Sequence, residues 1–321
     1  MNAHGYGAQT MVEPLRRVVV RAPSLAYGAA DPAEWHYHGK PDLAEARREH
    51  AELAALLEDE GAELIWHEAD LPGLADAMYV HDPALVCDAG TIVLSMGKAL
   101  RRGEETPLSQ TLEAAGVPIH YRLQGDARAE GGDLLWIDRE TLAVGQGFRT
   151  NQAALEQLSE ALAPLAVSCV PVPLPVSGGA GACLHLMSLI SMIDEDLAVA
   201  YPALLPVPFW RWLEERGIEV VTVPEAEFST QGPNVLALAP RRCVLLEDNV
   251  ETAARLHSAI CTRSPWARSM RCGSSSGSWP RPPLPPRSSS PRPRTRESRG
   301  PVASSVTITP SSGIRSTSRL P

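Results

Sequence analysis

Residues 82–96 read DPALVCDAGTIVLSM, and residues 134–147 read LLWIDRETLAVGQG. Each stretch contains two short apolar runs that are separated by a few turn-forming residues, such as the Asp-Ala-Gly at positions 88–90. Such short connections predict β-hairpins, since a crossover between parallel strands needs about a dozen residues or more. A doubly wound parallel sheet, the alternative α/β fold, therefore fits poorly.

The rest of the first 260 residues repeats this alternation of short strands and single helices. Five segments have helical apolar spacing, and two or three short strands lie between successive helices. A repeated strand-strand-helix-strand unit predicts a radial or ring-like α/β architecture. The fifth unit shows no closing strands after its helix. The expected helices are Asp42–Glu60, Glu104–Ala115, Gln152–Leu165, Phe209–Arg216 and Val250–Ala259. The expected strands are Arg17–Val20, Leu64–His67, Leu85–Cys87, Thr91–Met96, Ile119–Arg122, Leu134–Ile137, Leu142–Val144, Ser168–Val172, Leu184–Met192, Leu197–Tyr201, Val220–Val223, Val235–Leu238 and Cys243–Leu246.

The end of the chain differs sharply in composition from the rest. Residues 261–321 hold 16 Ser, 11 Pro and 11 Arg, no Lys and one acid, Glu297, which gives this segment a formal charge of +10. Since the whole chain carries −9, residues 1–260 carry −19. We therefore expect a globular domain over 1–260 and a tail over 261–321 that is disordered for lack of large apolar residues. The acidic body argues against affinity for nucleic acid.

The cysteines and the apolar stretches indicate the compartment. The six cysteines form no CxxC pair, which is typical of a reducing compartment. No segment has the apolar core of a signal peptide or the length of a membrane span. We expect a soluble, cytoplasmic protein without a cofactor. We also expect no metal site, because the one His-x-His pair, His36 and His38, has no cysteine or acid at ligand spacing.

Three stretches place titratable residues beside apolar strands, where burial is costly unless the residue is used. Asp82 lies in YVHDPALV, and His185 lies in the apolar run CLHLMSLI. Glu130 and Asp133 flank two glycines in AEGGDLLWID. Each residue also has a structural interpretation, as a turn or hairpin residue for the acids and as a core residue for the histidine.

Taken in chain order, these stretches and two arginine-containing turns resemble one family. The series YVHDPALV, MGKALRRGEE, AEGGDLLW, AVGQGFRTN, CLHLMS and PNVLALAPRR is similar to the dimethylarginine dimethylaminohydrolases of the guanidino-group-modifying superfamily, which also holds arginine deiminases and amidinotransferases. The resemblance covers about Leu15 to Ala259. It implies a five-bladed α/β propeller of strand-strand-helix-strand units, here with an incomplete fifth blade.

The resemblance also implies roles for the acids and the histidine. A guanidinium is a resonance-stabilised cation that carboxylates can hold, so Asp82 and Glu130 would bind its nitrogens. Glu130 would also orient His185, which would donate a proton to the leaving amine and then activate water. Asp133 is a weaker candidate for substrate binding and is equally suited to brace the hairpin.

The two arginines and one neighbouring histidine bear on the substrate. Arg101 in GKALRRGEE and Arg149 in GQGFRTNQA match family positions, so the resemblance implies that they bind the α-carboxylate of an amino-acid substrate. Arg149 could also simply precede an N-cap residue. His81 stands where many relatives carry an acid or an arginine, which leaves the substrate open.

The nucleophile of the family has no counterpart in the sequence as written. The family places a cysteine on its last strand, after a Gly-rich turn, and residues 261–321 contain no cysteine in that context. Cys272, in SMRCGSSSG, has the approximate position without the context, and Cys261 follows the last helix too closely. We expect this chain to be inactive, since the covalent step needs that thiol. A segment rich in Arg, Ser and Pro without Lys is typical of a GC-rich gene translated out of frame, so we hypothesise a frameshift.

The predicted function is therefore hydrolysis of a guanidinium C–N bond in an arginine derivative, giving citrulline and an amine, by Cys-His-Glu covalent catalysis. Three alternatives stay open: an arginine deiminase-like enzyme, an amidinotransferase, and a non-catalytic binder of arginine derivatives. A fourth is an interaction protein whose PPLPPR string binds an SH3-like domain and whose arginines bind nucleic acid. We expect a small guanidino substrate as the partner, with no nucleic acid and no membrane, and leave a homo-oligomer open.

Overall fold

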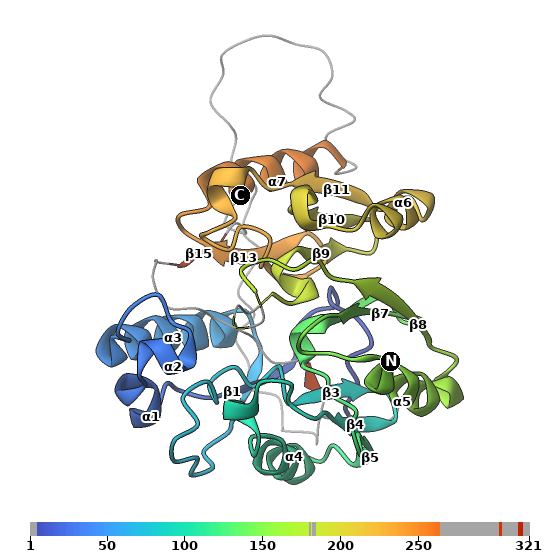
Figure 1. The fold of residues 1–321 in the computed structure, drawn as a ribbon. Helices are drawn as coiled ribbons and strands as arrows, with labels where there is room; N and C mark the ends of the chain where they lie inside the picture. Colours follow the sequence, from blue (N-terminus) through green and yellow to red (C-terminus); the bar gives the residue numbers. More distant parts are fainter. Residues whose placement is uncertain (1–4, 180, 182–183, 264–301, 304–313, 317–321) are drawn as a thin grey trace, which may run out of the picture.

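The computed structural model describes residues 5–179, 181, 184–263, 302–303 and 314–316, and within them the strands form five three-stranded sheets. Helices lie against the sheets around the molecule (Figure 1). The helices are α1 Leu25–Ala29, α2 Pro32–Trp35, α3 Leu43–Asp59, α4 Glu105–Ala114, α5 Gln152–Leu162, α6 Val207–Glu215 and α7 Val250–Arg263. The strands are β1 Arg17–Val20, β2 Glu63–Trp66, β3 Ala84–Cys87, β4 Gly90–Val93, β5 Ile119–Arg122, β6 Leu134–Asp138, β7 Thr141–Gln146, β8 Ser168–Pro173, β9 Ile190–Asp194, β10 Leu197–Ala200, β11 Glu219–Thr222, β12 Leu236–Ala239, β13 Arg242–Leu246, β14 Val302–Ala303 and β15 Ile314–Ser316.

Three units repeat the predicted strand-strand-helix-strand order. In each, an antiparallel hairpin is followed by a helix and then by a strand that pairs in parallel with the second strand of the hairpin. The parallel pairs are β4 with β5, β7 with β8 and β10 with β11. Both hairpins predicted from residues 82–96 and 134–147 are confirmed.

The five predicted helices are also confirmed, and local signals explain where they begin and end. Asp42 caps α3 by accepting the N–H of Glu45, and Asn151 caps α5 by accepting the N–H of Ala154. After α3, the chain continues into Gly61, whose φ of 89° places it in the left-handed region that favours glycine.

The core is a series of apolar clusters, and five of them each join two neighbouring sheets. Strand β6 shows why: Leu134 and Trp136 pack toward the β3–β5 sheet, whereas Leu135 and Ile137 pack toward the β9–β11 sheet, because successive strand residues point to opposite faces. Further clusters join the β9–β11 sheet to β12 and β13, these to β1, and β1 to β3. Each sheet is therefore buried on both sides.

Two local expectations differ from the structure. The predicted strand Leu184–Met192 is wrong in its first half, where a 3-10 turn over Leu186–Ser188 precedes β9. A continuous apolar run cannot distinguish a strand from a buried turn by periodicity. The short helices α1 and α2 were not predicted, since four or five residues are too few for a helical period.

The segment predicted as a tail contributes to three of these elements. Helix α7 continues to Arg263, beyond the expected boundary at residue 260. Strand β14 pairs in parallel with β1, and β15 pairs antiparallel with β13. Both polarities are opposite to those at the same places in the three regular units. The remainder of 261–321, including Cys272, lies outside the described residues, as does Cys183.

Candidate active site

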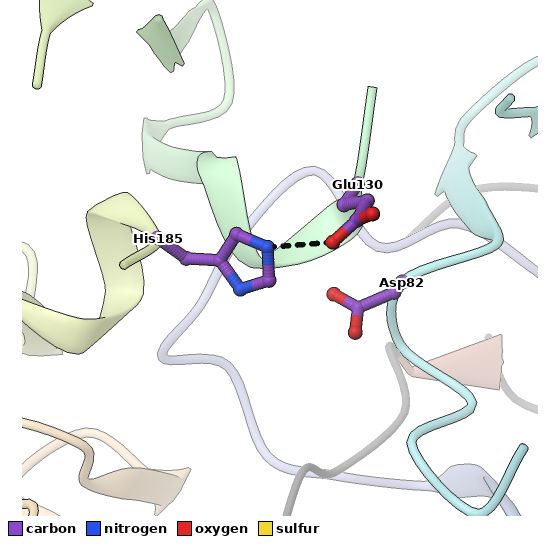
Figure 2. A group of neighbouring side chains, drawn as sticks. All are labelled: Asp82, Glu130 and His185. Carbon is purple, nitrogen blue, oxygen red and sulfur yellow. Dashed lines mark hydrogen bonds and ion pairs between the residues drawn. The ribbon is translucent and has the colours of Figure 1, made fainter. Parts of the chain in front are cut away.

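Three side chains from separate parts of the chain meet at one buried point. Asp82 precedes β3, Glu130 precedes the 3-10 turn Gly131–Asp133, and His185 precedes the turn that leads to β9. Figure 2 shows the two carboxylates and the imidazole turned toward one another. One ligand atom from each lies within 4.8 Å of the others, and all three residues are buried. The structure therefore brings together three residues named from the sequence, while their catalytic and substrate-binding roles stay predictions.

The two glycines of the EGGD motif allow this close approach. A Cβ on Gly131 would lie 2.1 Å from the carbonyl oxygen of His81, and a Cβ on Gly132 would lie 2.4 Å from His185 Nδ1. Neither position can accept a side chain without displacing backbone or the imidazole. The glycines thus let the Glu130 turn pack directly on its neighbours.

Glu130 is the centre of the hydrogen-bond network. Its Oε2 lies 2.8 Å from His185 Nε2 (Figure 2), and its Oε1 accepts the backbone N–H of Lys98 at 2.7 Å. Arg149 Nη1 lies 3.6 Å from the same Oε1. Burial opposes ionisation of Glu130, yet the hydrogen bond and charge of His185 outweigh it, so the pKa of this carboxyl is lowered. The carboxylate is therefore held ionised.

The backbone of His185 is held by hydrogen bonds at both its N–H and its carbonyl. Its backbone N–H donates to Ser188 Oγ at 3.2 Å, and its backbone carbonyl accepts the N–H of Ser188 at 3.0 Å. Because the Glu130 carboxylate is ionised, Nε2 carries the N–H that donates to it. A carboxylate that orients a histidine in one tautomer is the arrangement expected for acid–base chemistry.

Asp82 is the second ionised acid. Its Oδ1 accepts the N–H of Gly132 at 2.9 Å, and its Oδ2 accepts Arg101 Nη1 at 2.5 Å. Burial raises the pKa of Asp82, but the charge of Arg101, with smaller contributions from His185 and His81, outweighs that effect and lowers the pKa well below its usual range. Asp82 and Glu130 thus bring two negative charges to the same point.

Arg101 is fully engaged beneath Asp82. Besides Asp82, it donates to Glu104 at 2.8 Å and to the Tyr79 carbonyl at 3.0 Å. Burial lowers its pKa, but Glu104 and Asp82 raise it further, so the pKa of Arg101 lies well above its usual value. The contacts are those of a residue that orders Asp82, while its predicted role as a ligand for a substrate carboxylate stays a prediction. For the neighbouring acid Glu104, burial has the opposite effect and raises the pKa to about 7.

Asp133 ties together the turns that carry His185 and Arg149. Its Oδ1 accepts the N–H of Leu186 at 3.0 Å, and its Oδ2 accepts the Thr150 hydroxyl at 2.6 Å. Burial raises the pKa of Asp133 to about 6. These contacts match the bracing alternative, because both oxygens bind protein groups.

Sequence reasoning missed three participants in this network. Lys98 acts through its backbone N–H, Glu104 lies three residues beyond Arg101, and Thr150 bridges Asp133 and the N–H of Glu130. Backbone donors carry no residue-type signal. The acid in RRGE and the Thr of FRTN were, however, visible within the quoted motifs.

The described cysteines have partners of their own. Cys87 Sγ donates to the Gly90 carbonyl at 3.3 Å, and burial raises the pKa of Cys87 to about 11. Burial also raises the pKa of Cys169, and Cys243 is buried in the cluster around β13. Cys261 lies exposed on α7, 3.6 Å from His257 Nε2. A raised pKa disfavours the thiolate, so Cys87 and Cys169 are not activated thiols.

Asp82, Glu130 and His185 also have the residue types of a metal site. Their side-chain atoms, however, already form hydrogen bonds with Arg101, with backbone N–H groups or with one another. A metal ion would therefore compete with Arg101 and His185 for the carboxylate oxygens. Among the described residues no helix is long and apolar enough to cross a membrane.

A family model described as eukaryotic N,N-dimethylarginine dimethylhydrolase matches residues 33–253, more than half of the chain. The chain belongs to the dimethylarginine dimethylaminohydrolase family. The match contains Asp82, Glu130 and His185, and it ends before the segment of altered composition.

Several curated relatives support membership of this family. The chain is 30% identical over 207 residues to the uncharacterised protein YkgA of Bacillus subtilis, covering 64% of this chain and 67% of that one. It is 28% identical over 183 residues to the dimethylarginine dimethylaminohydrolase of Streptomyces coelicolor, covering 54% and 64%. An arginine deiminase of Rhodococcus jostii is 30% identical over 49% of this chain and 47% of its own. The chain thus spans about two thirds or less of these relatives.

Solved structures show the same fold. A variant of the Pseudomonas aeruginosa dimethylarginine dimethylaminohydrolase in complex with citrulline matches with a TM-score of 0.64 at 19% identity, covering 77% of this chain and 89% of that chain. An amidinotransferase of Microseira wollei from saxitoxin biosynthesis matches with a TM-score of 0.62 at 15% identity, covering 79% and 89%. The α/β fold of the dimethylarginine dimethylaminohydrolase family is therefore shared across hydrolases and transferases.

Proposed function

We propose that this chain binds the guanidino group of a small arginine derivative between Asp82 and Glu130. The observation that supports this most is the meeting of two carboxylates with lowered pKa values and one oriented imidazole at a buried point. A guanidinium donates hydrogen bonds from several nitrogens in one plane, and paired carboxylates complement it in charge and shape. Curated relatives named as dimethylarginine dimethylaminohydrolases and arginine deiminases support the same substrate class.

The chemistry proposed for the lineage is hydrolysis of one C–N bond of the guanidinium. A cysteine thiolate forms a bond to the central carbon, and the amine leaves with a proton from His185. Water then loses a proton to His185 and attacks the same carbon, releasing the thiolate and leaving a ureido group. Glu130 stabilises the protonated imidazole at each stage. In this chain we propose that the step stalls, because residues 261–321 as written offer no cysteine after a Gly-rich turn.

Assays of binding and of turnover test the two halves of the proposal separately. Calorimetry with arginine and with asymmetric dimethylarginine is expected to show binding, and a citrulline assay is expected to show no product. Absence of binding to every guanidino compound would overturn the site. Release of citrulline would overturn the inactivity, and release of ammonia from arginine in place of dimethylamine from dimethylarginine would favour a deiminase. A guanidino product formed from added glycine would favour the amidinotransferase alternative.

We also propose that the five sheets are the blades of a five-bladed propeller. The cyclic order of the apolar clusters, from β1 through the β3–β5, β6–β8 and β9–β11 sheets to β13 and back to β1, supports it. Cytoplasmic location and the absence of a cofactor stay predictions.

A further inference from the structure

Beside the guanidino site, one lysine ammonium fills a cage of two aromatic rings and a carboxylate. Lys98 Nζ lies 2.6 Å from Asp76 Oδ2 and donates to the Trp35 carbonyl at 3.1 Å. The same nitrogen lies 4.8 Å from the centre of the Trp35 ring and 5.9 Å from that of Tyr37. We call Trp35, Tyr37 and Asp76 the cation cage.

The cage is built rigidly by its own elements. Asp31 caps α2 by accepting two backbone N–H groups, Pro32 begins the helix, and His36 ends it with a φ of 62°. This turn presents Trp35, which is buried, and then Tyr37, whose hydroxyl donates to Asp76 Oδ1 at 2.5 Å. Both oxygens of Asp76 are therefore in use, one by Tyr37 and one by Lys98. Aromatic faces beside a carboxylate are a recognised way to bind an alkylammonium.

Short backbone links connect the cage to both carboxylates of the guanidino site. The N–H of Lys98 donates to Glu130 Oε1, so the residue that fills the cage also holds Glu130. Asp76 lies in the same turn region as Asp82: its carbonyl accepts the N–H of Tyr79, and the Tyr79 carbonyl accepts the N–H of Asp82 at 3.2 Å. The backbone nitrogen of Lys98 thus contacts the proposed guanidinium ligand Glu130, and its side chain runs from there to the cage.

The separation between Glu130 and the cage determines which part of a bound ligand would reach the cage. The side chains of lysine and arginine are similar in length, so an arginine whose guanidinium contacts Glu130 can carry its α-ammonium to the cage. In this protein it would meet a positive charge there, beside an aspartate whose two oxygens already accept hydrogen bonds. Like charges at short range repel strongly away from bulk water.

We propose that Lys98 is a specificity-determining residue that occupies the cation cage, so that the site selects arginine derivatives without a free α-ammonium over arginine itself. The inference rests on the proposed function, since it takes Asp82 and Glu130 as the guanidinium ligands. The chemical class is a guanidino carboxylate or an arginine acylated at its α-nitrogen. Lys98 selects among ligands through the charge it places in the cage.

Calorimetry on the full chain tests the selection with two probes that differ only in the ammonium: arginine and 5-guanidinopentanoate. The wild type is expected to bind 5-guanidinopentanoate at least about tenfold more tightly. Lys98→Met keeps the length and loses the charge, and it is expected to abolish or invert this ratio. Lys40, which is exposed, is the other of the two lysines in the chain, so Lys40→Met is the matched control and is expected to behave as wild type.

The outcomes separate this proposal from the function on which it rests. Equal binding of the two probes by the wild type, or an unchanged ratio in Lys98→Met, overturns the selection and leaves the guanidino site intact. Failure of both probes to bind, or binding that Glu130→Gln does not weaken, overturns the proposed function and the selection with it.

A second measurement needs no variant that might unfold. Because the chain has two lysines, protein labelled with 13C at lysine Cε gives two lysine signals, and the Lys98 signal is expected to be displaced by the ring currents of Trp35 and Tyr37. Saturating 5-guanidinopentanoate is expected to leave that displacement in place. A signal at the position of an exposed lysine, or one that moves there when the ligand binds, contradicts an ammonium that stays in the cage.

Discussion

Arg101 Nη1 lies 2.5 Å from Asp82 Oδ2, and the side chains of the two residues are 4% and 5% exposed. Glu104 completes the group on the other side of the guanidinium. A buried arginine between two acids orders both carboxylates and compensates their charge in a place that water does not reach. The ionised state of Asp82, which a guanidinium ligand requires, therefore depends on Arg101.

Replacing Arg101 by Met should destabilise the protein severely. The change leaves Asp82 and Glu104 buried without their shared cation, and breaking a buried pair in this way costs about 3–5 kcal/mol. Urea unfolding measures the loss, with Arg102→Met as the control because Arg102 is exposed beside it. A free energy of unfolding for Arg101→Met within about 1 kcal/mol of wild type would contradict a structural role for this arginine.

Glu130→Gln should weaken guanidino binding while the protein stays folded. The amide keeps the size and can still meet Lys98 and His185, but it removes one of two negative charges from the site. A charged hydrogen bond is stronger than a neutral one by about 1–2 kcal/mol, so affinity is expected to fall by about tenfold or more. Calorimetry with a bound guanidino ligand measures it, and Glu140→Gln, at an exposed turn, serves as the control.

The sequence was sufficient for the regular part of this fold because its patterns are local. Hairpins such as 134–147 are marked by two short apolar runs with a short turn between them. The predicted helices have apolar spacing, and α3 and α5 also begin with a capping residue. Trp136 illustrates the limit: its burial was predictable from the strand, but its partner sheet is decided by the packing of distant segments. The entry into β9 was misjudged because a buried turn and a buried strand have the same apolar composition.

The candidate site likewise has residues that could be predicted from the sequence and contacts that could not. Asp82, Glu130 and His185 were found because their flanking motifs resemble a family. The pairing of Arg101 with Asp82 and the partners of Asp133 could not be found so, because these contacts span 17 to 53 residues of chain. Lys98 had one usable signal, its rarity as one of two lysines, but its cage is assembled from Trp35 and Asp76, which no local pattern connects to it.

Asp133 should make stability depend on pH near neutrality. Its pKa is raised to about 6 from an ordinary 3.8, so between these values the folded state binds a proton that the unfolded state does not. The free energy of unfolding should therefore rise as the pH falls from 7 to 5, by about 1 kcal/mol from this group. Asp133→Asn does not titrate and should lack this share of the rise, whereas exposed Asp126→Asn should keep it. An identical rise in Asp133→Asn would assign the proton elsewhere, for example to Glu104.

Gly132→Ala should displace the imidazole of His185. The added methyl group would lie 2.4 Å from Nδ1 and 2.7 Å from Cγ, so the ring must move away from Glu130. We expect a loss of about 1–3 kcal/mol in stability, as for other overpacked sites, together with a changed imidazole signal in NMR. Gly39→Ala is the control, because a Cβ there meets nothing within 4 Å. A His185 resonance unchanged in Gly132→Ala would show that the turn yields instead of the histidine.

The polarity of β14 and β15 leads to the last prediction. In the three regular units the strand after the helix runs parallel to the strand before it, whereas β15 runs antiparallel to β13. Likewise, β14 runs parallel to β1, where the first pair of each regular unit is antiparallel. The segment as written therefore fills both edge positions in the reverse direction.

A native closing segment would continue from α7 into a strand parallel to β13 and then into one antiparallel to β1, with a Gly-rich turn and a cysteine. We predict that resequencing the gene beyond the codon for Ala259 recovers such a segment in another reading frame, and that the restored chain releases citrulline where the chain as written does not. Replacement of the recovered cysteine by serine should abolish release while leaving guanidino binding in place. If no frame encodes a cysteine after glycines at that position, the frameshift hypothesis fails, and the chain is better explained as a binder of guanidino compounds.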